Sequence, residues 1–265
     1  MCYEEPDSGG NLNFPLILMS FGVGILIGLT SMGGAALMAP FLILVVGVRP
    51  VTAVGTDLVY GAVTKIVGSW VHFRQGTVDV RLVRKLATGS IPGGLLGSLL
   101  VILLPRYTHD AQRFEQSAIG FLLVVVAIIL LARLMIGVPE AAPATNRMRF
   151  LQGPGTIIWG AIVGFCVGLT SVGSGSLLAP FLMMLYPSST SKVVGSDVCH
   201  AALLVSVTGL AHAASGGVEW NLVPTLLLGS IPGVILGSRL AAFVPPRPLR
   251  TGLAAVLLVT GVHML

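Results

Sequence analysis

Apolar runs separated by short polar clusters divide the whole chain. Many runs are close to the length of about 20 residues that a helix needs to cross the apolar core of a bilayer. The pattern predicts an all-α, polytopic membrane protein. Segments are predicted at 14–30, 35–48, 51–71, 86–104 and 118–136, and again at 157–170, 177–186, 193–213, 222–244 and 249–265.

The second half of the chain repeats the first at a spacing of 140 positions. The turn at 28–42 returns at 168–182, Gly55-Thr56-Asp57 returns as Gly195-Ser196-Asp197, and the Gly-Ser-Ile-Pro-Gly motif at 89–93 returns letter for letter at 229–233. A match without gaps indicates a duplicated unit. We expect a tail at 1–13, a first membrane repeat at 14–138, a linker at 139–152 and a second membrane repeat at 153–265.

Basic residues predict how the two repeats are oriented. The loop predicted at 74–85 carries Arg74, Arg81, Arg84 and Lys85, whereas its counterpart at 216–221 carries Glu219 and no base. Lys and Arg favour the cytoplasmic side, so these equivalent loops should lie on opposite sides. About five segments per half, an odd number, would produce that inversion. We therefore expect two inverted repeats, an extracytoplasmic tail and a cytoplasmic linker.

Composition narrows the class of protein further. Hydrophobic residues make up 54% of the 265 positions and charged residues only 9%, well below the share in soluble domains. The formal charge of +5 is not arranged in a basic stripe with aromatics, and the three cysteines show no metal-ligand spacing. No catalytic set emerges either. We expect no enzyme activity and no cofactor, metal or nucleic acid. The expected partners are a lipid bilayer and a small substrate, and the choice between monomer and homodimer is left open.

The two repeated turns are the strongest candidates for a substrate site. Glycines and hydroxyl residues interrupt an apolar run at the same place in each half, which predicts broken or re-entrant helices. Helix starts in such a place offer unpaired N–H groups to an anion, although close helix packing is the alternative reading. The candidate residues are Thr30, Ser31, Gly33, Gly34, Thr170, Ser171, Gly173, Ser174 and Gly175.

Two aspartates within apolar segments point to an ion-coupling site. An ionised carboxylate in the membrane is costly and usually faces a cavity, so Asp57 and Asp197 suggest proton uptake or cation binding. The alternative is a structural N-cap at the start of a segment. Lys65 has no counterpart in the second half, and it either neutralises an aspartate or binds the anion. The coupling candidates are Thr56, Asp57, Tyr60, Ser196, Asp197 and His200.

Together these motifs resemble the TauE/SafE family of sulfite exporters. The resemblance rests on Gly-x-x-Ser-x-Gly-Gly-x-x-Leu-x-x-Pro at 28–40, Gly-Thr-x-Leu at 55–58, His72, Gly-Thr-Val-Asp at 76–79 and Gly-Ser-Ile-Pro-Gly at 89–93. It implies a bacterial inner-membrane carrier for sulfite, sulfonates or related organosulfur anions. Asp57 and Asp197 depart from the Ser or Asn of many members, which suggests a proton-coupled subgroup.

We therefore expect a secondary transporter of a small sulfur-containing anion, working by rocking of two inverted halves. A facilitative anion channel of the same fold and a non-catalytic membrane assembly factor are the alternatives. The direction of transport is left open.

Overall fold

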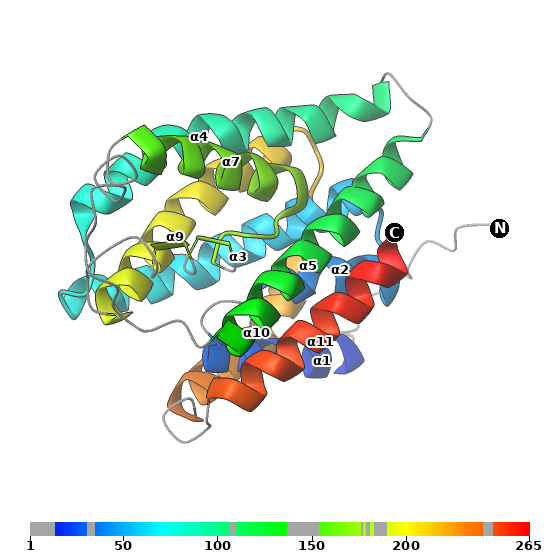
Figure 1. Cartoon of the computed structure of the whole chain (residues 1–265). Helices are drawn as coiled ribbons and strands as arrows, with labels where there is room; N and C mark the ends of the chain where they lie inside the picture. Colours follow the sequence, from blue (N-terminus) through cyan, green and yellow to red (C-terminus); the bar gives the residue numbers. More distant parts are fainter. Residues whose placement is uncertain are drawn as a thin grey trace.

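The chain forms a bundle of helices in the computed structural model, which describes residues 14–30, 35–106, 110–136, 154–175, 177–178, 181–182, 190–240 and 246–265. No strand occurs among these residues, and the all-α prediction is confirmed for them. The helices are α1 (Phe14–Thr30), α2 (Ala35–Leu44), α3 (Pro50–Arg74), α4 (Val80–Leu103), the short η1 (Leu104–Arg106), α5 (Ala111–Ile136), α7 (Pro154–Thr170), α9 (Thr190–Ala214), α10 (Leu222–Leu240) and α11 (Pro246–Met264), as shown in Figure 1.

Several helices begin earlier than their apolar runs. The predicted loop 74–85 is wrong from residue 80 onward, because Asp79 caps α4: its carboxylate accepts hydrogen bonds from the N–H groups of Arg81 (3.0 Å) and Leu82 (3.2 Å). Polar residues on the exposed side of this first turn hid the helix start. Similarly, α5 begins at Ala111 and not at 118. One predicted end is also wrong, because α2 ends at Leu44 and not at 48. The linker 139–152 and most of segment 177–186 lie outside the described residues.

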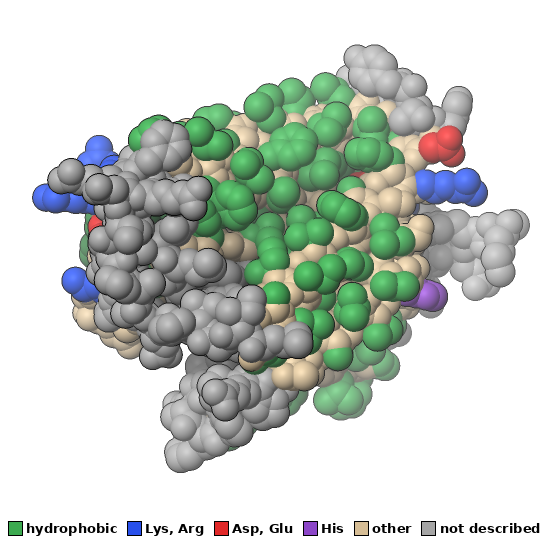
Figure 2. All heavy atoms as spheres, in the orientation of Figure 1, with side chains coloured by type: hydrophobic (Ala, Val, Ile, Leu, Met, Phe, Trp, Pro, Cys, Tyr) green, Lys and Arg blue, Asp and Glu red, His purple; other side chains and the backbone are tan. Residues whose placement is uncertain are grey.

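Long apolar helices support a membrane location. Within the described residues, three helices are long and apolar enough to cross a bilayer: Val80–Leu103, Ala111–Ala132 and Ser191–Ala214. Figure 2 shows hydrophobic side chains over the middle of one face, with charged side chains gathered at its two opposite ends. This distribution is expected of a protein whose middle contacts lipid and whose ends contact water.

Helices from the two halves pair with each other. The most extensive contacts join α4 to α7, α1 to α10, α3 to α9 and α5 to α11, and the α5–α11 pair is visible as neighbouring green and red ribbons in Figure 1. A shift of 140 residues relates α1 to α7, α3 to α9, α4 to α10 and α5 to α11. The α4–α7 pair therefore corresponds to the α10–α1 pair, whereas α3–α9 and α5–α11 each join a helix to its own counterpart. The duplicated sequence is therefore matched by a duplicated set of contacts.

Glycines set the register of these pairs. A Cβ added at Gly89, Gly93 or Gly97 of α4 would overlap the carbonyl of Ile157, Ala161 or Phe165 of α7, respectively. Both series advance by one turn at each step, so α4 and α7 run parallel. The counterparts in α10, Gly229, Gly233 and Gly237, meet the carbonyls of Ile17, Phe21 and Ile25 in α1 in the same way. Small residues thus let the backbones approach closely, as is usual between membrane helices.

Equivalent helices run in opposite directions. Gly68 of α3 faces Val198 near the start of α9, while Gly209 near the end of α9 faces Leu58 and Val59 near the start of α3. The α3–α9 pair is therefore antiparallel. In the same way, Gly120 near the start of α5 lies beside Gly261 near the end of α11.

Two glycines in α1 give a matched test of this packing. We expect Gly24→Ala to lower stability by about 1–3 kcal/mol, the usual cost of overpacking, because its methyl group would overlap the Ser230 backbone of α10. A methyl group at Gly22 would have no neighbouring atom within 4 Å, so Gly22→Ala should be neutral or should add about 0.5–1 kcal/mol. Thermal unfolding of both variants in detergent checks this, and equal midpoints for the two variants would contradict the α1–α10 register.

Candidate functional site

The second repeated turn breaks the helix at the expected place. Helix α7 ends at Thr170, Ser171 adopts φ = 62° and Gly173 φ = 115°. Such angles suit glycine and are unusual for serine. The Thr170 hydroxyl donates to the Cys166 carbonyl (2.8 Å) and accepts from the Val172 N–H (3.2 Å). This hydroxyl thus satisfies the backbone where the helix stops.

This turn contacts the middle of α3 from the other half of the chain. The Ser171 hydroxyl donates a hydrogen bond to Asp57 Oδ2 (2.7 Å), and the Lys65 ammonium donates one to the Ser174 hydroxyl. Asp57, Ser171 and Ser174 are all at most 5% exposed. Three residues predicted to bind substrate, Ser171, Ser174 and Lys65, therefore lie together with one residue predicted to couple an ion, Asp57. We call these four residues the turn–α3 cluster.

The aspartates are not helix caps. Asp57 and Asp197 lie about two turns inside α3 (Pro50–Arg74) and α9 (Thr190–Ala214) and are 2% and 3% exposed. The N-cap alternative is therefore wrong. In each carboxylate, Oδ1 is buried and has no hydrogen-bond partner. Buried polar atoms are normally paired, so two unpaired carboxylate oxygens at equivalent positions are unusual. The predicted part of both aspartates in ion coupling stays a prediction.

The two carboxylates lie at different levels of the α3–α9 pair. Val198 faces Gly68, so in this antiparallel pair Asp197 lies level with residue 69 of α3. Asp57 and Asp197 are therefore offset by about 12 residues, or about 18 Å along the helix axis. Lys65 lies between these levels, and its ammonium interacts electrostatically with both carboxylates. Lys65 thus interacts with one aspartate from each half of the chain.

A ring follows each aspartate by three residues, and both rings are buried. His200 Nε2 lies 2.6 Å from the Ser90 hydroxyl of α4, while His200 Nδ1 has no partner in the described residues. Tyr60 occupies the equivalent place, and its hydroxyl interacts with that of Ser230 in α10. The geometry of a full hydrogen bond is not met there. Sequence reasoning singled out both rings but missed Ser90 and Ser230. The exact recurrence of their Gly-Ser-Ile-Pro-Gly motif was the available signal.

Thr56 and Ser196 connect the two halves. The Thr56 hydroxyl accepts from the Glu219 N–H (2.9 Å), and the Ser196 hydroxyl accepts from the Asp79 N–H (2.8 Å). Each also donates 2.7 Å to the carbonyl four residues earlier, of Thr52 or Lys192. Both hydroxyls thus hold the loop that precedes α10 or α4 against the opposite helix. Their predicted part in ion coupling stays a prediction.

Removing one of these bonds should weaken the fold. We expect Thr56→Val to cost about 1–3 kcal/mol, because the Glu219 N–H loses its partner in a partly buried place. Thr64→Val is the control in the same helix: the Thr64 hydroxyl bonds only carbonyls of its own helix, so the change in unfolding free energy should be close to zero. Denaturant unfolding of the two variants makes the comparison, and equal losses would show that the cross-link contributes nothing.

The first repeated turn falls largely outside the described residues. Thr30 is the last residue of α1, but its side chain, together with Ser31, Gly33 and Gly34, lies beyond what the structure describes. Their predicted role stays a prediction. By the 140-residue repeat, Ser31 corresponds to Ser171, whereas Gly34 corresponds to Ser174 and carries no hydroxyl.

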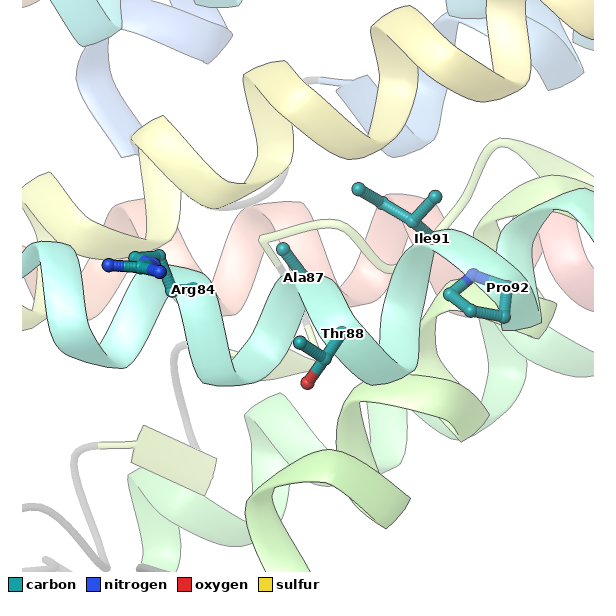
Figure 3. Close-up of a pocket in the computed structure, with 5 residues that line it drawn as sticks. All are labelled: Arg84, Ala87, Thr88, Ile91 and Pro92. Carbon is teal, nitrogen blue, oxygen red and sulfur yellow. The ribbon is translucent and has the colours of Figure 1, made fainter.

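An open groove on α4 is separate from the turn–α3 cluster. Figure 3 shows its described lining, which comes from one helix: Arg84, Ala87, Thr88, Ile91 and Pro92. None of the candidate residues belongs to this lining. Among the described residues, no three His, Cys, Asp or Glu side chains lie together as a metal site would need.

Comparison with known proteins identifies a family. The model of the family "Sulfite exporter TauE/SafE" matches residues 16–264. The chain is 42% identical over 258 residues to the probable membrane transporter protein YjnA of Bacillus subtilis, covering 96% of this chain and all of YjnA. It is 26% identical over 265 residues to the probable membrane transporter protein MJ0441 of Methanocaldococcus jannaschii, covering 94% of each chain. No solved structure matches.

The apolar helices, the buried polar cluster and these relatives define a membrane transporter. The chain belongs to the TauE/SafE sulfite exporter family.

Proposed function

We propose that this protein is a secondary transporter that moves a small sulfur-containing anion, such as sulfite, a sulfonate or a related organosulfur acid, across the bacterial inner membrane. It acts by binding and release, without catalysis. The anion binds at the turn–α3 cluster, where Lys65 supplies positive charge and Ser171 and Ser174 supply hydroxyl groups.

One observation carries this proposal: the turn of the second half meets α3 of the first half through Ser171–Asp57 and Lys65–Ser174. Transporters built from repeats bind substrate where discontinuous helices of two halves meet. The cluster has that composition, because it combines a helix break, a cation and a carboxylate with an unpaired oxygen. Thr30, Ser31, Gly33 and Gly34 of the first turn belong to the proposed substrate site through the sequence repeat alone.

The two halves are inverted in the membrane, with the N-terminus outside and the linker in the cytoplasm. The antiparallel directions of α3 and α9 and of α5 and α11 support this arrangement, because an inverted repeat turns each helix against its counterpart. The basic residues at 74–85, against Glu219 in the equivalent loop, support the assignment of sides.

Protons drive the transport in this proposal. A carboxylate beside an anion site repels the substrate unless it is protonated or balanced by a cation, and Lys65 is shared between Asp57 and Asp197. Proton uptake by an aspartate therefore favours anion binding, and proton release favours anion release. In this proposal the proton passes through Tyr60 and His200, which each follow an aspartate by one turn.

Uptake into liposomes tests the function. Purified protein should accumulate labelled sulfite against its gradient when a pH gradient is imposed, and the initial rate should saturate with sulfite concentration. A channel would give a rate that rises linearly and would never concentrate the anion. If no sulfur-containing anion moved in either direction while the protein remained folded, the proposed function would be wrong.

A further inference from the structure

The repeated contacts around α3 and α9 are unequal in the two halves. Helix α4 packs extensively on α9, whereas its counterpart α10 packs far less on α3. Gly94 of α4 lies against Leu204 and Thr208, and both of these side chains are fully buried. The equivalent positions of Leu204 and Thr208 in α3 are Thr64 and Gly68, which are only half-buried. The α4–α9 interface is thus closed, and the α10–α3 interface is more open.

A polar pair shows the same difference. In the closed interface, the Ser90 hydroxyl and His200 Nε2 are hydrogen-bonded at 2.6 Å. In the open interface, the buried Ser230 and Tyr60 hydroxyls interact, but the geometry of a full hydrogen bond is not met. One pair is hydrogen-bonded and the equivalent pair is in looser contact. This difference is expected in one conformation of a transporter that alternates between two. A buried hydroxyl without a bond costs free energy, which a conformation that pairs it would recover.

We propose that Ser90 and Ser230 are gating residues whose two bonds alternate. In the conformation described here Ser90 binds His200; in the opposite conformation α4 moves away from α9, α10 closes on α3, and Ser230 binds Tyr60. This inference rests on the proposed function in one respect, namely that the protein alternates between two conformations. The serine of each Gly-Ser-Ile-Pro-Gly motif then keeps one of the two interfaces closed, and we call the α4–α9 and α10–α3 interfaces the two gates.

The charged surroundings fit this task. Lys65 of α3 acts electrostatically on His200, and Asp197 precedes His200 by one turn in α9. Asp57 acts in the same way on Tyr60. Each gate therefore adjoins a buried aspartate, and a change of charge at that aspartate changes the electrostatic energy of the gate.

Cadmium bridges measure the two gates separately. With the three native cysteines replaced by alanine, Ser90→Cys places a thiol against His200, and the pair can bind Cd²⁺. Tyr60→His with Ser230→Cys builds the same pair of ligands in the other interface. We expect each protein to bind one Cd²⁺, with at least about tenfold tighter binding for the Ser90→Cys protein, because only its pair is in contact in the resting conformation.

A protein that carries both pairs decides whether the gates alternate. We expect it to bind one Cd²⁺ per chain, because closing one gate opens the other. Independent binding of two ions would overturn the proposal, and so would equal affinities of the two single-gate proteins or no binding by the Tyr60→His, Ser230→Cys protein. None of these measurements needs a substrate, so a wrong substrate assignment would leave the result intact.

The variant Ser90→Ala distinguishes a gating role of Ser90 from a role in helix packing. Ser90→Ala removes one hydrogen bond from the closed gate, so the population of the opposite conformation should rise about fivefold. Added to the Tyr60→His, Ser230→Cys protein, it should tighten Cd²⁺ binding by that factor. Ser98→Ala is the matched control, because Ser98 is buried in the same helix but donates to Gly168 of α7 (3.3 Å). Equal effects of Ser90→Ala and Ser98→Ala would contradict the gating role.

Discussion

Lys65→Met should reduce saturable sulfite uptake by about 30-fold or more. Losing one member of a buried charged contact costs about 2–5 kcal/mol, and 2 kcal/mol corresponds to about 30-fold in affinity. Lys65 is the cation of the turn–α3 cluster and has Val205 as its counterpart, so the second half offers no replacement. Initial rates in liposomes over a range of sulfite concentrations measure the loss.

Lys192→Met is the control for removing a lysine, because Lys192 is exposed in the first turn of α9, and it should leave uptake unchanged. The double variant Lys65→Met, Asp57→Asn separates two roles of Lys65. If Lys65 binds the anion, the double variant stays as weak as Lys65→Met. Recovery of uptake would show that Lys65 only neutralises Asp57, and wild-type uptake by Lys65→Met itself would remove it from the site altogether.

Asp57→Asn should also have a large effect, because it should uncouple transport from proton movement. The amide keeps the size of the carboxylate and can still accept the bond from Ser171, but it takes up no proton. Accumulation driven by a pH gradient should fall to the level without a gradient. Exchange of internal for external sulfite should continue, because it needs binding but no net proton movement.

Asp79→Asn provides the matched control, since Asp79 caps α4 and an asparagine caps almost as well. Its pH-driven accumulation should equal that of the wild type. Uptake by Asp57→Asn that responded to the pH gradient as steeply as wild-type uptake would refute proton coupling through Asp57.

The helical architecture could be predicted from the sequence because a helix that crosses a membrane needs a long run of apolar residues. Apolar runs identified the helices, and an ungapped repeat identified the duplicated unit. Helix starts were harder to predict. The first turn of α4 carries Arg81, Arg84 and Lys85, which a hydropathy pattern assigns to a loop, whereas the Asp79 cap determines the true beginning.

The candidate site could be predicted residue by residue but not as a set of contacts. Asp57 and Ser171 are 114 positions apart, and Lys65 and Ser174 are 109 apart. Nothing local in either segment specifies those partners, because the contacts depend on how α7 packs against the rest of the bundle. Ser90 and Ser230 were overlooked for a related reason. In a glycine- and proline-containing motif they resemble packing residues, and only the fold brings them to His200 and Tyr60.

Equilibrium binding of sulfite to the purified protein tests the central claim, that the turn–α3 cluster holds a sulfur-containing anion. The account predicts one sulfite bound per chain, because Lys65 and Ser174 occur in one half only. It also predicts competition by sulfonates but not by acetate, and clear weakening of binding in Ser174→Ala. Tight binding of acetate with no binding of any sulfur-containing anion, or sulfite binding unchanged in both Ser174→Ala and Lys65→Met, would contradict it.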